Sequence, residues 1–379
     1  MSARASKGMG FVIQVFRIRW LVSLLAVVIA FAIGAVFIVL ADASVVDAYY
    51  AMFRGSIVDL NAPNAVRMFK PLTDSLFYSI PLIISGLGLA LGFRAGLFNI
   101  GGKGQIIVGA LAAVWVGFSL NLPPVVHTLV ALLVAIVAGG LYGGIAGVLK
   151  AKTGANEVIV TIMLNSIATL GLGYILTQKA WQVPGTNQPV TPKVAESAAL
   201  ARLLPAPFKL HVGFLVALLA LVAFWWLIER STLGFQIRAV GANAAAARTA
   251  GISVERITAI TMVLSGAFLG LAGANEALGT IGYVSRDVAG SIGFDAITVA
   301  LLGRNKTWGT FGAGLLFGAF KAGGYAMQAK GVPIDMILIL QSVIVLLIAA
   351  PALVRWLFRL PDVRALAART RKGNADEHK

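Results

Sequence analysis

Long apolar runs constrain this chain more than any other feature. Stretches of about 20 mostly apolar residues recur along it, and a helix of that length spans the hydrocarbon core of a bilayer. In lipid only helices and closed barrels satisfy their backbone hydrogen bonds internally. The chain is 59% hydrophobic and 12% charged, and it shows no strand-type alternation. The sequence therefore predicts an all-α polytopic membrane protein.

Ten spans are predicted, five on each side of a long polar interval at residues 229–256. Two halves with five spans each would be inverted in the membrane, and a weak similarity between residues 85–101 and 265–282 agrees with such a repeat. The eighth span is short and polar. The spans are expected at residues 20–40, 71–93, 106–120, 126–149, 157–176, 211–228, 257–281, within 288–302, 308–327 and 333–357.

The charge distribution predicts the orientation. The net charge is +16, and cations collect on the cytoplasmic side of membrane proteins, which explains this excess better than nucleic-acid binding. One alternating set of polar segments, including both ends of the chain, holds 21 Lys and Arg residues, and the opposite set holds 9. We therefore expect residues 1–19, 229–256 and 358–379 to be cytoplasmic, and residues 41–70 and 179–210 to be extracytoplasmic.

The central polar interval carries four arginines and only two acidic residues. Residues 242–250 are rich in helix-forming side chains, and Gly251 is a natural C-cap. One interpretation is an exposed cationic helix that contacts a cytosolic partner. The other is an ordinary connecting loop whose arginines only set the topology. Composition alone favours neither.

A polar stripe runs along the fifth predicted span. Glu157, Thr161 and Asn165 follow at intervals of four residues, which places them on one helical face. Such a stripe is costly against lipid, so it should face the bundle interior or a wet cavity. It could line the path of a polar solute or form interhelical hydrogen bonds that fix the packing. We favour the path.

Other polar residues lie where glycines interrupt the helices, as at transporter sites. Phe98 and Asn99 belong to the Gly-rich turn FRAGLFNIGGKGQ and could form the end of a broken helix. Asn275 and Glu276 lie late in the seventh span, and Asp295 lies in the eighth. The alternative for both carboxylates is a position at the wet outer interface.

The fourth span carries a pattern of small residues. Gly139, Gly143 and Gly147 recur at four-residue spacing. Glycines at this spacing let two helix backbones approach closely. We expect this face to pack tightly against a neighbouring helix.

The sequence argues against an enzyme. It has no cysteine and three scattered histidines, so we expect no metal site. The segment around Lys103 fails the phosphate-loop pattern because Gly104 stands where Ser or Thr belongs. No nucleophile–base pair or carboxylate dyad is visible. Any energy from ATP must therefore come from another subunit.

Three segments carry a family resemblance: FRAGLFNIGGKGQIIVGA, NEVIVTIMLNSIA and GFQIRAVGANAAAARTAGI, in this order. Together they resemble the permease subunits of bacterial ABC importers, over roughly residues 71–353. The nearest branch is the nucleoside permeases that work with basic membrane lipoprotein-type binding proteins. Ribose-type sugar and branched-chain amino-acid permeases are more distant.

The resemblance implies a ten-helix fold like that of the cobalamin-importer permease, formed by residues 1–379 as one transmembrane domain in the bacterial inner membrane. Two permeases, commonly two different chains, would form the pore. Two ATPase domains, which bind the ATP and Mg²⁺, would dock on cytoplasmic coupling helices. An extracytoplasmic binding protein would deliver the substrate.

The expected function is nucleoside import, purine-type, by ATP-driven alternating access. The central interval matches the coupling position, so its candidate ATPase contacts are Arg238, Gly241, Asn243, Arg248, Thr249 and Gly251. The candidate path residues are Phe98, Asn99, Asn156, Glu157, Thr161, Asn165, Asn275 and Glu276. Ser166 stands where the family motif usually has an aromatic residue, which predicts a different or wider substrate range.

Three alternatives stay open. A simple-sugar permease would share these transmembrane motifs. A secondary transporter could use Glu157 or Glu276 as a proton carrier. A membrane scaffold would transport nothing, so replacing Glu157 and Asn165 would change no solute flux.

Overall fold

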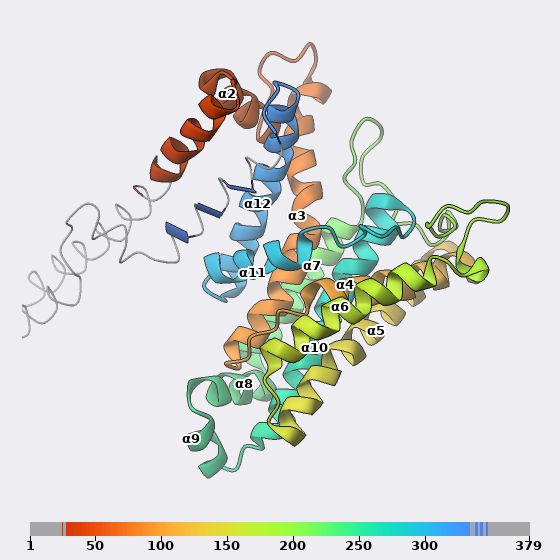
Figure 1. The fold of residues 1–379 in the computed structure, drawn as a ribbon, viewed down its shortest axis with the longest axis vertical. Helices are drawn as coiled ribbons and strands as arrows, with labels where there is room; N and C mark the ends of the chain where they lie inside the picture. Colours follow the sequence, from red (N-terminus) through yellow and green to blue (C-terminus); the bar gives the residue numbers. More distant parts are fainter. Residues whose placement is uncertain (1–24, 26–27, 334–337, 340–341, 344–345, 348–379) are drawn as a thin grey trace, which may run out of the picture. The chain divides into compact units, whose positions relative to one another are not determined.

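The computed structural model describes residue 25, residues 28–333 and residues 338–339, 342–343 and 346–347 (Figure 1). It contains two compact units. The smaller comprises Met1–Ala51 with Gly324–Lys379, and the larger comprises Met52–Gly323. Every predicted site residue belongs to the larger unit. The described residues form helices and no β-strand, apart from one isolated bridge between Arg202 and His211.

The larger unit is built from long helices joined by short helical pieces. The long helices are α3 (Ala65–Arg94), α4 (Gly102–Ser119), α5 (Pro124–Thr153), α6 (Glu157–Ile175), α7 (Gly213–Trp225) and α10 (Val254–Asn275). The short elements are η1 (Lys179–Trp181), η2 (Trp226–Arg230), α8 (Thr232–Ala242), α9 (Ala244–Thr249), η3 (Glu276–Ile281) and α11 (Ile292–Leu302). Helices α2 (Val45–Ser56) and α12 (Thr307–Gln328) each cross the boundary between the units.

Six helices are long and apolar enough to cross a membrane: Ala65–Arg94, Gly102–Ser119, Pro124–Thr153, Glu157–Ile175, Gly213–Arg230 and Val254–Ile281. They coincide with the second to seventh predicted spans. The bent pair Val28–Leu40 and Val45–Ser56, with an angle of 119°, would make a seventh span if it counts as one. The eighth predicted span is the short helix α11, and the ninth is α12.

This comparison confirms the predicted class, an all-helical polytopic membrane protein. The tenth predicted span lies largely outside the described residues, and so does the beginning of the first span, at residues 20–27. The count of ten therefore stays a prediction.

Helix α5 packs directly against α10 through glycines. A Cβ atom added to Gly139 would lie 2.5 Å from the carbonyl oxygen of Gly266, and one added to Gly143 would lie 2.7 Å from that of Met262. A Cβ on Gly147 would meet the Met262 side chain at 2.7 Å. Real side chains do not fit at such distances, so the predicted close packing of this face is confirmed.

The same helix, α10, also packs closely against α4. A Cβ on Gly273 would lie 2.1 Å from the carbonyl oxygen of Ile106, and one on Gly109 would lie 2.4 Å from the Cα of Gly270. Helix α3 contacts α10 as well. Helix α10 is therefore the central element of the larger unit, and its glycines let its backbone approach those of α4 and α5.

The long loop between α6 and α7 covers one end of this bundle. Thr191 and Val194 donate backbone hydrogen bonds to the carbonyls of Val284 and Gly282, both at 3.0 Å, and Ala195 donates to Gly117 at 2.9 Å. These bonds tie the loop to the ends of η3 and α4. The loop is thus an ordered cap rather than a free linker.

Four polar turns meet at the other end of the bundle, where Figure 1 shows α8 and α9. They are the turns between α3 and α4, between α5 and α6, between α8 and α9, and between α11 and α12. Arg94 donates from Nε to the carbonyl of Asn305 at 2.7 Å, and its own carbonyl faces Gly241. Glu157 contacts both Phe98 and Lys150. All four turns belong to the set of segments that holds most of the lysines and arginines. The fold therefore gathers at one end the segments that the charge count predicts to share a side.

The glycine contacts predict a stability difference between two variants. Gly139→Ala should lower the melting temperature by about 5 °C, because overpacking a filled interface costs about 1–3 kcal/mol. Gly171→Ala on α6 is the matched control, since a Cβ there meets no atom within 4 Å. Thermal unfolding of the purified chain in detergent measures both. Equal melting temperatures would contradict the close α5–α10 contact.

Candidate functional site

The polar stripe of α6 faces the turn between α3 and α4. Glu157, Thr161 and Asn165 each contact the backbone of residues 98–104. Asn156 caps the helix, because its Oδ1 accepts a hydrogen bond from the N–H of Val158 at 2.9 Å. The structure thus brings six of the eight predicted path residues to one junction: Phe98, Asn99, Asn156, Glu157, Thr161 and Asn165.

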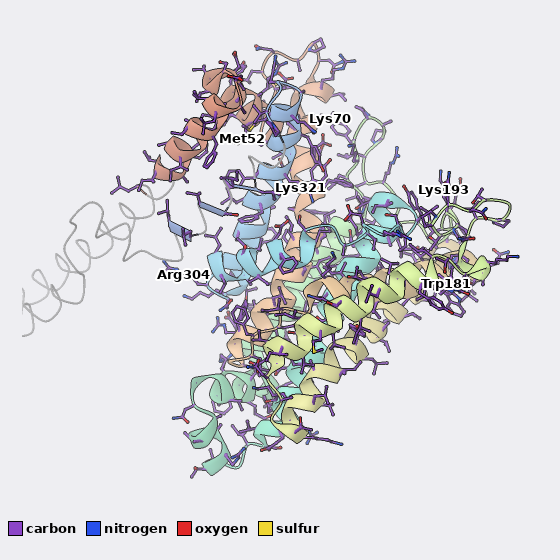
Figure 2. The ribbon with its side chains drawn as sticks, viewed as in Figure 1. Met52, Lys70, Trp181, Lys193, Arg304 and Lys321 are labelled. Carbon is purple, nitrogen blue, oxygen red and sulfur yellow. The ribbon has the colours of Figure 1, made fainter. Side chains whose placement is uncertain are left out.

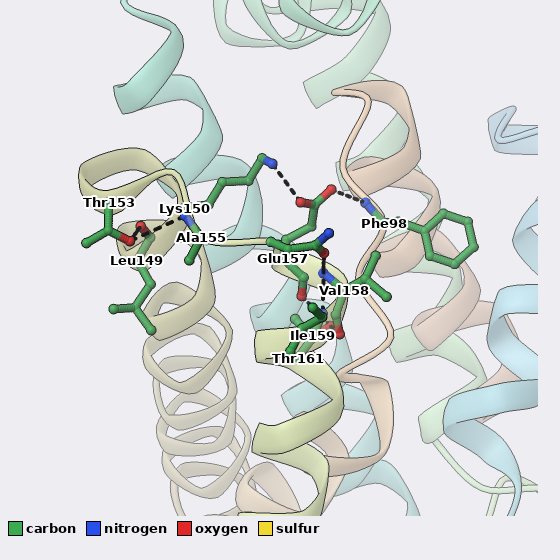
Figure 3. Close-up of polar contacts among 10 residues, drawn as sticks. Phe98, Leu149, Lys150, Thr153, Ala155, Glu157, Val158, Ile159 and Thr161 are labelled. Atoms are coloured by element: carbon green, nitrogen blue, oxygen red, sulfur yellow. Dashed lines mark hydrogen bonds and ion pairs between the residues drawn. The ribbon is translucent and has the colours of Figure 1, made fainter.

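Both carboxylate oxygens of Glu157 are engaged by the protein (Figure 3). Oε2 lies 2.6 Å from Nζ of Lys150 at the end of α5, and Oε1 accepts from the N–H of Phe98 at 3.4 Å. The Glu157 side chain is only 12% exposed. A partly buried pair of this kind fixes the start of α6 against the end of α5 and against the turn.

Thr161 and Asn165 hold the backbone of one residue of the turn, Ile100, through its N–H and its carbonyl. The N–H of Ile100 donates to the buried Thr161 hydroxyl at 3.2 Å, and the Ile100 carbonyl accepts from Nδ2 of Asn165 at 2.8 Å. Oδ1 of Asn165 also accepts from the N–H of Gly104 at 2.8 Å. Backbone groups at a helix break need such partners. At about 1 kcal/mol each, these three bonds contribute on the order of 3 kcal/mol.

Asn99 anchors the turn to a second helix. Its side chain is 1% exposed, and Nδ2 donates to Oγ of Ser265 on α10 at 2.9 Å. Asn99 and Gln105 also exchange amide hydrogen bonds, at 3.0 and 3.2 Å. Phe98 is the accessible part of the turn, with 39% of its side chain exposed and its ring centroid 4.9 Å from that of Phe93.

Sequence reasoning missed the partners that hold these residues. Lys150, Gln105 and Ser265 were not singled out, although each bonds a predicted site residue. Ser265 had a signal, because it opens the segment that resembles residues 85–101. Lys150 had a weaker one, since it lies seven residues before Glu157, across a turn that contains Gly154.

The remaining two path candidates lie apart from this junction, where α10 passes into η3. Asn275 is fully buried, and neither its Oδ1 nor its Nδ2 has a hydrogen-bond partner among the described residues. Its neighbour is His211, which sequence reasoning set aside. A Cβ on Gly213 would lie 2.3 Å from Nδ2 of Asn275 and 2.5 Å from Cε1 of His211. The two side chains therefore flank the same point.

His211 lies two residues before the span that begins at Gly213, and it is buried against the ring of Phe77 at 5.4 Å between centroids. Its Nδ1 accepts from the N–H of Gly213 at 3.0 Å, so the ring hydrogen is on Nε2. Burial lowers the pKa of His211 from 6.5 to about 4. The imidazole is therefore neutral near pH 7.

Glu276 of η3 and Asp295 of α11 both lie within electrostatic range of Lys321. The charge of Lys321 acts on both Glu276 and Asp295. Figure 2 shows Lys321 on α12. Asp295 also accepts from the Ser291 hydroxyl at 2.6 Å.

The six predicted coupling residues lie on α8, α9 and the junctions beside them. Asn243 ends α8 and caps α9, because its Oδ1 accepts from the N–H of Ala246 at 3.1 Å. Gly251 follows α9 with φ of +81°, the left-handed conformation expected of a C-cap glycine. The helix predicted over residues 242–250 is therefore the shorter α9, which Asn243 separates from the end of α8. The other four residues are Arg238, Gly241, Arg248 and Thr249.

An open apolar groove of about 560 Å³ lies between α8 and α9. Phe235, Ala239, Ala246 and Ile252 are among the residues that line it. Arg248 lies on the exposed surface of α9, where it pairs with Glu255 at 2.7 Å. An exposed pair of this kind adds little stability. The loop therefore presents an apolar groove beside an exposed cation.

The neutral state of His211 predicts sensitivity to acid. Below pH 6.5 the unfolded chain takes up a proton that the folded chain resists, so stability falls as the pH drops toward 4. The loss should reach at most about 3 kcal/mol. Melting curves of the wild type and His211→Gln across this range should diverge, with the wild type losing more. Parallel curves would show that His211 does not resist protonation in the fold.

The comparisons with known proteins cover nearly the whole chain. Residues 72–349 match the family described as branched-chain amino acid transport system / permease component. The guanosine ABC transporter permease protein NupP of Bacillus subtilis is 40% identical over 89% of this chain and 94% of its own length. The nucleoside ABC transporter permease protein NupB of Lactococcus lactis is 31% identical over 92% and 95%.

A third relative has a different name. The glucose ABC transporter permease protein TsgB13 of Haloferax volcanii is 35% identical over 85% of both chains. No solved structure matches the chain. The family resemblance of the three sequence segments is confirmed. The chain therefore belongs to the branched-chain amino acid transport system / permease component family, the family of these ABC transporter permeases.

Proposed function

We propose that this chain is the transmembrane permease subunit of an ABC importer that carries nucleosides, purine-type, across a bacterial cytoplasmic membrane. The observation that carries this proposal is the 40% identity to a guanosine permease over 94% of that protein's length. A second relative over 90% covered, NupB, is also named for nucleosides.

The proposed architecture has ten spans in two inverted halves that form one transmembrane domain, as in the cobalamin-importer type of permease. The helices described for eight of the predicted spans support it. The shared end of the cation-rich turns supports a cytoplasmic position for residues 229–256, and the count of lysines and arginines supports the same side for both ends of the chain. Residues 41–70 and 179–210 then face outward.

The groove between α8 and α9 is proposed as the docking surface for a cytoplasmic ABC ATPase. Its apolar lining suits an inserted apolar side chain, and Arg238, Arg248 and Thr249 would contact the rim of that partner. Asn243 and Gly251 shape the loop by capping α9. ATP and Mg²⁺ would be bound by the partner, and this chain would carry out no bond chemistry.

The mechanism proposed is alternating access. ATP binding would close the ATPase pair, displace the α8–α9 loop, and open the permease to one side of the membrane at a time. A second permease chain, expected to be a different polypeptide, would complete the pore, and an extracytoplasmic binding protein would deliver the substrate. A neutral nucleoside suits a path with amide and hydroxyl groups and with accessible aromatic rings such as that of Phe98.

The exposed Ser166 of α6 bears on substrate range. It stands where the family motif usually has an aromatic side chain. A small hydroxyl there would leave more space, which supports a wider range of substrates. A sugar is the second candidate substrate, favoured by the 35% identity to the glucose permease TsgB13.

Substrate competition tests the nucleoside proposal. Vesicles with the complete transporter should take up labelled adenosine only when ATP is inside the compartment that holds the ATPase. Unlabelled guanosine in 100-fold excess should reduce this uptake at least tenfold, and ribose or glucose should not. A protonophore should leave the rate unchanged, which separates this mechanism from a proton-coupled one. Uptake of labelled glucose without adenosine uptake would establish the sugar alternative instead.

A charge in the groove tests the docking proposal. Ala246→Asp places a carboxylate in the apolar groove, and burying it without a partner is costly. We expect the amount of ATPase protein that co-purifies with the permease in detergent to fall at least tenfold. Ala65→Asp, at the exposed start of α3, is the matched control and should retain normal binding. Normal ATPase recovery with Ala246→Asp would place the docking surface elsewhere.

A further inference from the structure

One segment, residues 94–104, is bonded to α10 through Asn99 and also contacts three further elements at the same end of the bundle. It comprises the last residue of α3, the turn that follows and the first residues of α4. It contacts the α8–α9 loop, the turn between α11 and α12, and the polar stripe of α6.

The contact with the α8–α9 loop is backbone on backbone. A Cβ on Gly241 would lie 2.1 Å from the carbonyl oxygen of Arg94 and 2.9 Å from the carbonyl carbon of Ala95. Gly96 has a φ of +73°, and a Cβ on it would lie 3.6 Å from the Cα of Gly241. No side chain separates the two segments, so neither can shift toward the other without a clash.

The contact with the α11–α12 turn uses the Arg94 side chain, whose Nε donates to the carbonyl of Asn305 at 2.7 Å. Asn305 and the preceding Arg304, labelled in Figure 2, both have positive φ values, 54° and 53°. Non-glycine residues rarely adopt this conformation. The Asn305 carbonyl therefore belongs to a turn of specific backbone conformation, and Arg94 binds to this turn.

The contact with α6 consists of four hydrogen bonds. The backbone N–H groups of Phe98, Ile100 and Gly104 donate to the side chains of Glu157, Thr161 and Asn165, and Asn165 donates to the Ile100 carbonyl. Helix α6 is the least buried of the six long apolar helices. Because α6 has little other packing, we infer that its position depends on its hydrogen bonds to residues 94–104.

We propose that residues 94–104 transmit movement of the α8–α9 loop, residues 232–249, to α6, with Gly241 and the backbone of Ile100 as the two positioning contacts. The proposal rests on the proposed function, in which that loop carries the ATPase and α6 lies along the substrate path. The polar stripe of α6 then serves as the attachment of the moving helix. Gly241 keeps the loop in direct contact with the segment, because any side chain would force them apart.

Two single variants break the two contacts. Gly241→Ala pushes the loop away from Arg94, and Thr161→Val removes the acceptor of the Ile100 N–H with almost no change in volume. Gly171→Ala, on α6 itself with open space around its Cβ, is the matched control. Each is assembled as the complete transporter in vesicles. ATP hydrolysis, nucleoside uptake and the apparent KM for the nucleoside are then measured together.

The expected result is uncoupling. Each single variant should keep at least half of the wild-type ATP hydrolysis and lose at least tenfold in nucleoside imported per ATP. The KM should not rise for Thr161→Val, because the proposal assigns Thr161 to the attachment of α6 in place of the substrate path. The Gly241→Ala/Thr161→Val double variant should be no more than about twofold worse than the worse single variant, because both break one link. The control should match the wild type.

Other results would overturn the proposal. Uptake that falls only in proportion to ATP hydrolysis would show that the segment does not transmit movement. Losses that multiply in the double variant would show two independent roles, and a raised KM for Thr161→Val would assign that residue to the path. If Gly241→Ala fails to assemble, Thr161→Val alone decides. Absence of ATP-driven nucleoside uptake in the wild type would refute the proposed function instead.

Discussion

The structure depends on the absence of side chains where α10 meets its neighbours. Glycines at positions 266, 270 and 273 bring the α10 backbone close to carbonyl oxygens of α5 and α4. Without a strong hydrophobic drive between helices in lipid, such close van der Waals contact is the main source of association. It holds α4, α5 and α10 together as a stiff group, against which α6 is a more weakly packed neighbour.

The second constraint is that interrupted helices must find partners for their free backbone groups. In and after the turn that follows α3, the N–H groups of Phe98, Ile100 and Gly104 and the Ile100 carbonyl have no helical partners. The side chains of α6 provide these partners. The polar stripe of α6, which the sequence suggested as a lining for a solute path, thus also binds the protein's own backbone. Both uses need the same chemistry, which is why the residue types alone did not separate them.

The cation-rich turns connect packing with function. Arg94 joins the turn between α11 and α12 to the end of α3, and Gly241 joins the α8–α9 loop to the same place. Segments far apart in sequence therefore form one polar end that also carries the open groove. This end is the one proposed to face a cytoplasmic partner, while the α6–α7 loop closes the opposite end through backbone bonds.

The sequence by itself determined the helical membrane class, the positions of most helices, the glycine packing face of α5 and the permease family, because these follow from apolar length, small-residue spacing and local motifs. It did not determine that Glu157 pairs with Lys150, that Asn99 reaches Ser265, or that His211 lies beside Asn275. Those pairings join residues from different helices. Only the tertiary structure decides them, because helix rotation and the breaks in the chain set which polar groups meet.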